Sequence, residues 1–208
     1  MNLANKTTLI FDFGGVIINL NKEKALKNFE KIGLLNIAKM LDNFFPIDVF
    51  LKLETGEISN NEFLKYLQKA STQKPDKEQV KEAFLSFLDD IPNEKLDLLL
   101  ELKKHYKILM LSNTNGIHFP YCVATKFSYN NHSINDFFDK CYLSYQIKLV
   151  KPHKEIFEFL LRDSNLQPSE CLFFDDSQTN LDTAKLLQID TQLVEPFTDL
   201  RKYCKNLL

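Results

Sequence analysis

The sequence predicts an α/β fold in which a parallel sheet lies between two layers of helices. Three observations predict it: short apolar runs recur along the chain, helical patterns separate most of them, and polar residues follow the runs. The runs are mostly continuous rather than alternating, which is typical of strands covered on both faces. Strands that alternate with helices indicate right-handed crossover connections and therefore a parallel sheet.

The elements follow one another in a regular order. Candidate strands occupy residues 7–11, 106–112, 140–144, 170–174 and 191–194, and helical patterns occupy residues 93–105, 154–163 and 180–188. This order predicts a three-layer, Rossmann-like core.

Residues 20–90 break the rhythm, because they hold several helical stretches and no convincing strand. Ser59 with Glu62 three residues later forms a capping-box pattern, and apolar residues follow it on one helical face. Gly56 is expected to adopt a left-handed conformation that ends the preceding helix. We therefore expect a core domain formed by residues 1–19 and 91–208, and an inserted helical cap domain formed by residues 20–90.

The connections between these two domains are expected near residues 17–21 and 89–93, where acidic residues and Pro92 interrupt the helical pattern. Phe44, Phe45 and Phe50 lie in the insertion. We expect them to pack in its core rather than to form a substrate platform.

Composition excludes several classes of function. The chain has 26 basic and 28 acidic residues, a formal net charge of −2, so it lacks the basic footprint of a nucleic-acid-binding protein. Four cysteines lie far apart, without zinc or disulfide spacing, and are expected to be reduced thiols. The first eight residues lack signal-peptide features, and no run approaches the ~20 apolar residues of a membrane span. We expect a soluble, cytoplasmic protein without nucleic-acid or membrane partners.

Polar residues gather where the predicted strands end. In open parallel sheets, ligands bind in the crevice beyond the carboxyl ends of the strands. The residues at or just beyond those ends are Asp12, Ser112, Asn113, Lys151, Asp175 and Asp176.

This set of side chains suits a magnesium-assisted phosphoryl transfer. Magnesium is commonly held by one or two carboxylates, waters and a phosphate oxygen, and crowded carboxylates repel one another unless a cation lies among them. Asp12 could then attack phosphorus and form an aspartyl phosphate. Lys151, Ser112 and backbone N–H groups would stabilise the charge on the phosphoryl oxygens.

Four segments carry a family resemblance. FDFGGVI, LMLSNTN, KLVKPHKEIF and FFDDSQTN resemble, in order, the four motifs of the haloacid dehalogenase superfamily of phosphatases, and the resemblance covers almost the whole chain. The helical insertion is similar to the first cap type of that family. The resemblance implies a haloacid dehalogenase-like core with an inserted helical cap.

The same resemblance implies a role for each motif residue. Asp12 would be the nucleophile and a magnesium ligand, Asp176 would bind the metal directly, and Asp175 would bind it directly or through water. The backbone carbonyl of Gly14 would be another metal ligand. Ser112 and Asn113 would hold the phosphate, and Lys151 would bridge it to the nucleophile.

Gly14 departs from the family pattern, in which a second aspartate two residues after the nucleophile protonates the leaving oxygen. General acid–base assistance is typically worth ~100-fold to ~10,000-fold, so its loss needs an explanation. The leaving group could need little protonation, as in a sugar 1-phosphate. Alternatively, His118 or a cap acid such as Glu54 could supply the proton, or the site could be inactive.

The sequence therefore predicts a Mg²⁺-dependent phosphomonoester hydrolase that acts on a small phosphorylated metabolite, such as a sugar 1-phosphate. Two alternatives remain: a metal-free 2-haloacid dehalogenase-like hydrolase and a non-catalytic phosphate-binding protein. Asp175 and Asp176 argue against the dehalogenase, because two unneutralised carboxylates would oppose an attacking anion. Taken alone, Asp12 could be a turn former, and Gly14 and Gly15 an ordinary tight turn.

Overall fold

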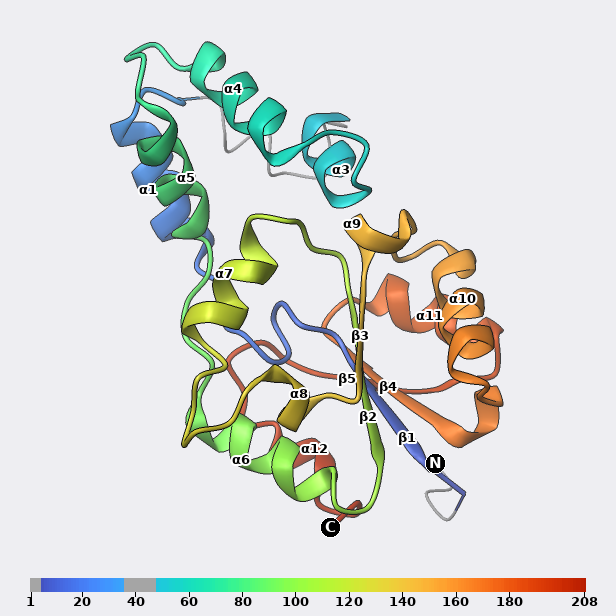
Figure 1. Cartoon of the computed structure of the whole chain (residues 1–208). Helices are drawn as coiled ribbons and strands as arrows, with labels where there is room; N and C mark the ends of the chain where they lie inside the picture. The colour runs from blue at the N-terminus through green and yellow to red at the C-terminus, as the bar shows by residue number, and fades with distance from the viewer. Residues whose placement is uncertain (1–4, 36–47) are drawn as a thin grey trace.

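The sheet has five parallel strands in the order β3-β2-β1-β4-β5 (Figure 1). The structure is a computed structural model, and it describes residues 5–35 and 48–208. The strands are β1 (Thr8–Phe11), β2 (Lys107–Ser112), β3 (Lys140–Leu143), β4 (Cys171–Asp175) and β5 (Asp190–Leu193). The predicted α/β fold with a parallel sheet is confirmed.

Helices cover both faces of this sheet. One layer contains α6 (Asn93–Leu102), α7 (His118–Thr125), α8 (Ile134–Phe137) and α12 (Arg201–Cys204). The other contains α10 (Lys154–Ser164) and α11 (Gln178–Leu186), and the short helices α9 (Ser144–Ile147) and η1 (Pro168–Glu170) connect elements of the sheet.

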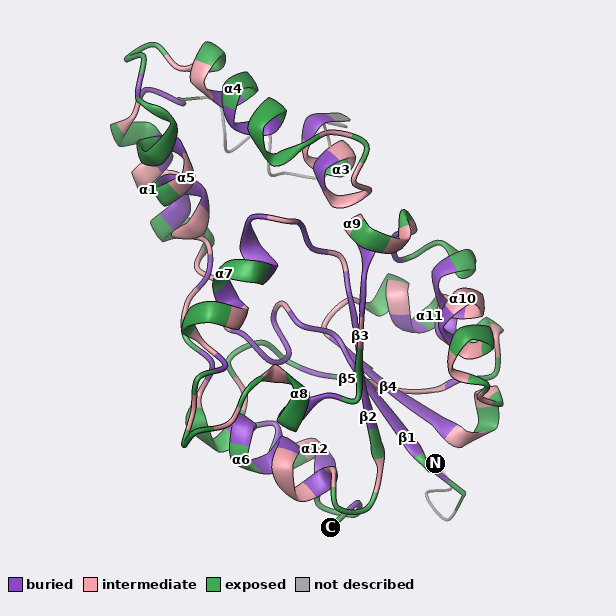
Figure 2. Cartoon of the chain, viewed as in Figure 1, coloured by how far each residue is buried: buried purple, intermediate pink, exposed green. Residues whose placement is uncertain are grey.

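The two layers have separate apolar cores, because successive strand residues point to opposite faces. Leu9 and Phe11 of β1 belong to the cluster with α6 and α12, whereas Ile10 belongs to the cluster with α10 and α11. Phe11 stacks on Phe174 of β4, with ring centroids 4.6 Å apart. Both faces of β1 are buried (Figure 2), which explains why this strand reads as a continuous apolar run.

Element ends differ from the expected ones by a few residues. The expected helix 180–188 begins at Gln178 and ends at Leu186. Two residues later, Gln188 adopts a left-handed backbone with a φ of 63°. The expected helix 93–105 ends at Leu102. Neither difference changes the topology.

A second group of helices lies beyond the carboxyl ends of the strands (Figure 1). We call these the insertion helices: α1 (Lys22–Lys31), α3 (Asp48–Glu54), α4 (Asn60–Ala70) and α5 (Lys77–Leu85). They share an apolar cluster of their own, which includes Phe29, Phe63 and Phe84. Phe50 packs against Phe63 and Phe84, as expected, whereas Phe44 and Phe45 lie outside the described residues.

Local chemistry sets the ends of the insertion helices. The capping box of α4 is confirmed: Ser59 accepts a hydrogen bond from the Glu62 N–H, and Glu62 accepts one from the Ser59 N–H. Gly56 has a φ of +66°, also as predicted, and it turns the chain between α3 and α4.

The two chain segments that lead to and from the insertion helices run side by side. The N–H of Asn21 donates to the Phe87 carbonyl at 2.8 Å, and the N–H of Asp89 donates to the Asn19 carbonyl at 2.9 Å. Lys126, the residue that follows α7, forms an ion pair with Asp90 in the second segment. These bonds join the insertion helices to the sheet-containing part through a paired connection.

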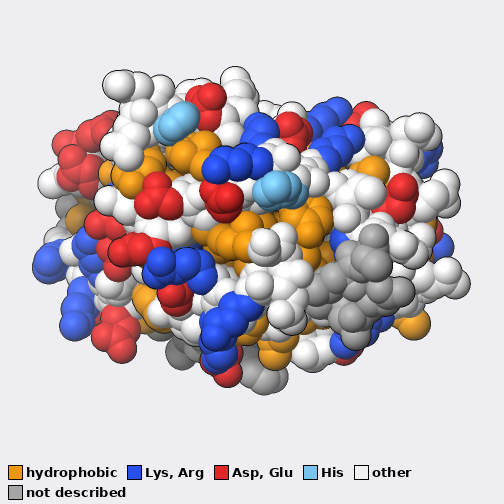
Figure 3. Space-filling model, turned by 90° about the horizontal axis from the view of Figure 1, so that it is seen from below, with side chains coloured by type: hydrophobic (Ala, Val, Ile, Leu, Met, Phe, Trp, Pro, Cys, Tyr) orange, Lys and Arg blue, Asp and Glu red, His pale blue; other side chains and the backbone are white. Residues whose placement is uncertain are grey.

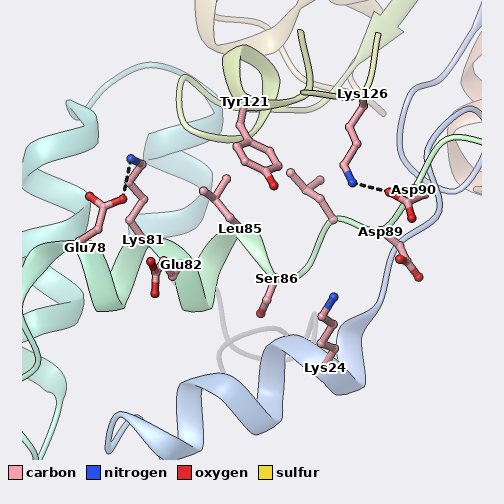
Figure 4. Close-up of a pocket in the computed structure, with 11 residues that line it drawn as sticks. Lys24, Glu78, Lys81, Glu82, Leu85, Ser86, Asp89, Asp90, Tyr121 and Lys126 are labelled. Carbon is pink, nitrogen blue, oxygen red and sulfur yellow. Dashed lines mark hydrogen bonds and ion pairs between the residues drawn. The ribbon is translucent and has the colours of Figure 1, made fainter. Parts of the chain in front are cut away.

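A hollow of about 500 Å³ lies beside this connection, between α1, α5 and α7 (Figure 4). It is lined by Lys24 of α1, by acidic and basic side chains of α5 and of the segment that follows α5, and by Tyr121 of α7. No residue of the predicted phosphate or metal site lines this hollow. It therefore belongs to the junction between the two helix groups and not to the site described below.

The exposed surface agrees with the nearly balanced charge. The face at the amino ends of the strands carries acidic and basic side chains intermingled, with apolar side chains between them (Figure 3). All four cysteines are free. Within the described ranges, no helix combines the length and apolar character needed to cross a bilayer.

Candidate active site

The site residues come together because β1 lies between β2 and β4. Asp12 follows β1, Ser112 ends β2, and Asp175 ends β4, so all three lie at one edge of the sheet. The Asp12 N–H donates to the Phe174 carbonyl at 2.8 Å, which extends the pairing of β1 and β4 up to the site.

Lys151 is the charged centre of the site. Its Nζ lies 2.8 Å from Oδ1 of Asp12 and 2.6 Å from Oδ2 of Asp175, and its side chain is 1% exposed. Burial opposes the ammonium, but the two carboxylates outweigh it and raise the pKa of Lys151. Burial also raises the pKa of Asp12 to about 7, although Lys151 acts in the opposite direction. The lysine thus bridges the predicted nucleophile and the fourth-strand acid.

Three carboxylates converge at this point. Asp12, Asp175 and Asp176 each offer an oxygen, and these oxygens all lie within 4.8 Å of one another. One ammonium opposes three carboxylates, so two negative charges remain unbalanced when all three are ionised. Burial, and then Asp175, raise the pKa of Asp176. Oxygen donors with this excess charge fit a divalent cation such as Mg²⁺.

The three acids are not equivalent. The Oδ1 of Asp175 accepts hydrogen bonds from the Ser177 N–H at 2.8 Å and from the Asn180 side chain at 2.9 Å, while its Oδ2 accepts from Lys151. Both oxygens of this fully buried carboxylate therefore have protein partners. Asp176 is more exposed than Asp175, so it is better placed to bind a metal directly.

The turn after β1 depends on Gly15. This residue has a φ of +74°, and a Cβ built on it would lie 2.2 Å from Oδ2 of Asp176. The Phe13 N–H donates to Oδ1 of Asp12 at 2.7 Å, so the same turn also orients the aspartate. A Cβ on Gly14 would meet only the end of the Leu20 side chain, at 3.1 Å. Gly15 is thus required by close approach to an acid, whereas Gly14 is not.

Ser112 and Asn113 lie at the end of β2, but their side chains differ in how far other protein groups already occupy them. The amide of Asn113 forms two bonds with the Lys151 backbone: Nδ2 donates to the carbonyl and Oδ1 accepts from the N–H, both at 2.9 Å. The Asn113 side chain therefore positions Lys151. The Ser112 side chain is buried, and its hydroxyl lies 3.4 Å from the Asn113 carbonyl oxygen.

Two further residues hold the loop after β2 at the site, and their role was not predicted from the sequence. Ser144 accepts a hydrogen bond from the Thr114 N–H and donates one to its carbonyl, both at 3.0 Å. The Asn115 side-chain oxygen accepts hydrogen bonds from the Ile117 and His118 N–H groups at the start of α7. The position of Ser144 just after a strand was the available signal, but a single serine there is too common to interpret.

The two candidates for the missing acid lie in different surroundings. His118 is buried, stacks on Phe84 with centroids 3.9 Å apart, and has its Nε2 3.1 Å from the Phe84 carbonyl. Burial lowers its pKa to about 4. Glu54, at the end of α3, is half-buried and interacts electrostatically with Lys151. The structure therefore associates His118 with the insertion helices and Glu54 with the candidate site.

The fold and the site define an α/β protein that carries a carboxylate–lysine cluster at the carboxyl edge of a parallel sheet. Comparison with known proteins identifies the family. Residues 6–187 match the model of the haloacid dehalogenase-like hydrolases. A D-ribitol-5-phosphate phosphatase of Bacteroides thetaiotaomicron is 38% identical over 194 residues, which is 93% of this chain and 94% of the relative.

Solved structures agree. A magnesium complex of a HAD family enzyme from Bacteroides thetaiotaomicron is 38% identical, with a TM-score of 0.90 over 96% of this chain and 98% of that one. An aspartate-to-alanine mutant of that enzyme, in complex with magnesium and inorganic phosphate, gives a TM-score of 0.92 at 37% identity over 95% and 98%. A HAD-like family hydrolase from Porphyromonas gingivalis is 34% identical, with a TM-score of 0.90 over 98% of each chain. The chain therefore belongs to the haloacid dehalogenase-like hydrolase family.

Proposed function

We propose that this protein is a Mg²⁺-dependent phosphomonoester hydrolase that works through an aspartyl phosphate on Asp12. The observation that carries the proposal is the cluster in which Lys151 bridges Asp12 and Asp175 while Asp176 lies within reach of both acids. A nucleophilic carboxylate, a cation site and a buried ammonium are the parts that transfer of a phosphoryl dianion needs. The magnesium and phosphate complexes of the related enzyme support the same assignment.

The residues divide the work as follows. The hydrogen bonds to Asp12 from the described residues fall on Oδ1, and Oδ2 is the oxygen we assign to attack on phosphorus. Lys151 neutralises charge on the nucleophile and on the incoming phosphoryl group. Ser112 and the backbone N–H of Asn113 would hold the phosphoryl oxygens, since the Asn113 side chain is bonded to Lys151.

Mg²⁺ would be held by Asp12, Asp176 and the carbonyl of Gly14, with Asp175 contributing directly or through water. When bound, it supplies positive charge that lets two anions approach each other. Lys151 alone balances only part of the negative charge of the three acids, which is why the cation belongs to the proposal.

The substrate we propose is a small phosphorylated sugar or sugar alcohol. The curated relative is a D-ribitol-5-phosphate phosphatase. The sequence also resembles bacterial α-D-glucose-1-phosphate phosphatase, through LSNTN followed by His118, YLS before Lys151, and FFDD with Asn180. The relative and the resemblance both support a compact polyhydroxylated phosphate ester as substrate, and they differ on whether the phosphate is on a primary or an anomeric oxygen.

We also propose that the protein acts in the cytoplasm. We further propose that residues 20–90 form a cap domain, with residues 1–19 and 91–208 as the core. The separate apolar cluster of the insertion helices and the paired connection at Asn19–Asn21 and Phe87–Asp90 support the division. Such a cap would exclude water from the site and select the substrate.

Phosphate release tests the proposal against its two alternatives. We expect release from p-nitrophenyl phosphate and from D-ribitol 5-phosphate with Mg²⁺, loss of release with EDTA, and no release by Asp12→Asn. Metal-independent halide release from 2-haloacids would instead establish the dehalogenase. Neither activity, across a panel of phosphorylated metabolites, would contradict the proposal and leave the non-catalytic phosphate-binding protein.

A further inference from the structure

The segment from Glu54 to Asn60, between α3 and α4, contacts the core at the carboxyl edge of the sheet. A Cβ on Gly56 would lie 2.3 Å from the Tyr145 carbonyl oxygen on α9, so this backbone is pressed against the core. The Asn60 side chain donates to the Gly116 carbonyl at 2.9 Å. The first contact follows β3 and the second follows β2. The segment therefore spans the loops that flank the candidate site.

Glu54 is brought to the site by these contacts. It is half-buried, and Lys151, which holds the nucleophile, acts on its carboxyl group. Burial raises the pKa of Glu54 to about 7, and Lys151 opposes part of that rise. A carboxyl group with such a pKa can be protonated or ionised near neutral pH, which a general acid–base catalyst requires.

The other groups considered for the proton do not fit. Gly14 stands where the family has its usual acid. The ring of His118 is packed against Phe84 and its Nε2 contacts the Phe84 carbonyl, so it is directed into the insertion helices. Asp176 belongs to the metal cluster. Of the groups considered, this leaves Glu54.

We propose that Glu54 is the general acid–base catalyst of this enzyme and that it replaces the aspartate missing at Gly14. The inference rests on the proposed phosphatase function. Asp12 Oδ2 forms a bond to phosphorus while the bond from phosphorus to the ester oxygen breaks. The ester oxygen takes the proton of the Glu54 carboxyl group and leaves as an alcohol.

The second half of the reaction restores both acids. The Glu54 carboxylate takes a proton from water, whose oxygen bonds to phosphorus as the bond from phosphorus to Asp12 breaks. Inorganic phosphate leaves, Asp12 is again a carboxylate, and Glu54 is again protonated. Acid catalysis by a cap residue links turnover to cap closure, because Glu54 reaches the site only while its segment contacts α9 and the loop after β2.

Leaving-group dependence tests this assignment. Glu54→Gln keeps the shape of the side chain and removes the proton. With D-ribitol 5-phosphate, whose leaving alkoxide needs a proton, we expect kcat/KM, which reports the steps up to departure of the alcohol, to fall ~100-fold or more. With p-nitrophenyl phosphate, whose leaving group is a stable anion, we expect kcat/KM to fall far less, whereas kcat should fall for both substrates because both share the aspartyl phosphate that Glu54 helps to hydrolyse. Glu57→Gln is the matched control, because Glu57 lies on the same segment and is exposed, and it should leave both rates unchanged.

The pH profile gives a second readout. Lys151 is the charged group that acts on Glu54 from the core, Tyr145 lies on the contacting helix α9, and Lys52 and Glu57 are its charged neighbours in sequence. Because the acid must be protonated, kcat/KM for D-ribitol 5-phosphate should fall as the pH rises through about 7 in the wild type. Glu54→Gln should lose this descending limb.

The outcomes separate this inference from the proposed function. A wild-type enzyme that releases no phosphate overturns the phosphatase. If the wild type is active, equal losses of kcat/KM for Glu54→Gln on both substrates, or a raised KM with unchanged kcat, overturn general acid–base catalysis by Glu54. Unchanged thermal unfolding of the variant shows that the loss comes from chemistry. If the variant is destabilised, the ratio of its kcat/KM losses on the two substrates, measured with the same preparation, still decides whether Glu54 acts as the general acid.

Discussion

Removal of the Lys151 ammonium should cost the protein much of its stability when no metal is present. In Lys151→Met, the apolar stem remains and the charge between Asp12 and Asp175 is lost. The two carboxylates have side chains 13% and 0% exposed, so neither can regain full hydration. Removing one partner of a buried ion pair costs about 3–5 kcal/mol. At roughly 2–4 °C per kcal/mol for a chain of this size, Tm should fall by about 6–20 °C.

Thermal unfolding in EDTA measures this effect. Lys154→Met is the control, because Lys154 is exposed and pairs with Glu158 at 3.4 Å on the surface of α10. Such a helical surface pair is worth only about 0.3–0.5 kcal/mol, so Tm should change by no more than about 2 °C. A Lys151→Met variant that unfolds at the same temperature as Lys154→Met would refute the argument that the ammonium compensates two buried acids.

Two further predictions concern the turn and the cation. Gly15→Ala should destabilise the protein by about 1 kcal/mol or more and weaken Mg²⁺ binding, because the φ of Gly15 is +74° and the added Cβ would meet Asp176. Gly14→Ala is the control: its Cβ would meet only Leu20, so stability and Mg²⁺ binding should both stay unchanged. Calorimetry with Mg²⁺ measures both effects. Without metal, burial raises the pKa of Asp12 to about 7, so its stabilising contribution is complete below its unfolded pKa and is lost as the pH rises through about 7. Tm in EDTA should therefore be lower at pH 8 than at pH 5, and Mg²⁺ should raise Tm more at pH 8, since it binds the ionised acid. An equal metal effect at both pH values would contradict the placement of Asp12 among the ligands.

The fold and the positions of the site residues could be predicted because they follow from chain order. Strands β1, β2 and β4 each hold a run of buried apolar residues, and a polar residue stands where the apolar run ends, as Phe11 is followed by Asp12. Parallel strands bring their carboxyl ends to one edge of the sheet. The meeting of residues 12, 112 and 175 at that edge can therefore be predicted without knowing any side-chain contact. The capping box at Ser59 and the left-handed conformation of Gly56 could also be predicted, because each depends only on residues close in sequence.

What could not be predicted depends on contacts between distant segments. The sequence did not show that the Asn113 amide would bond to the Lys151 backbone, since 38 residues separate them. The sequence offered Glu54 and His118 as alternatives for the missing acid, and the packing of α3 against α9 and of His118 against Phe84 distinguishes them. Burial and neighbouring charge, which set the pKa of each group, are properties of the folded chain.

Covalent trapping of the enzyme during turnover tests the central claim most directly. Wild-type protein would be mixed with Mg²⁺ and D-ribitol 5-phosphate and treated with borohydride, which reduces an acyl phosphate, and its peptides would be analysed by mass spectrometry. We predict a reduced residue at position 12 in the wild type and none in Asp12→Asn. Steady release of phosphate with Asp12 unmodified, or with the trapped group on another residue, would contradict the account.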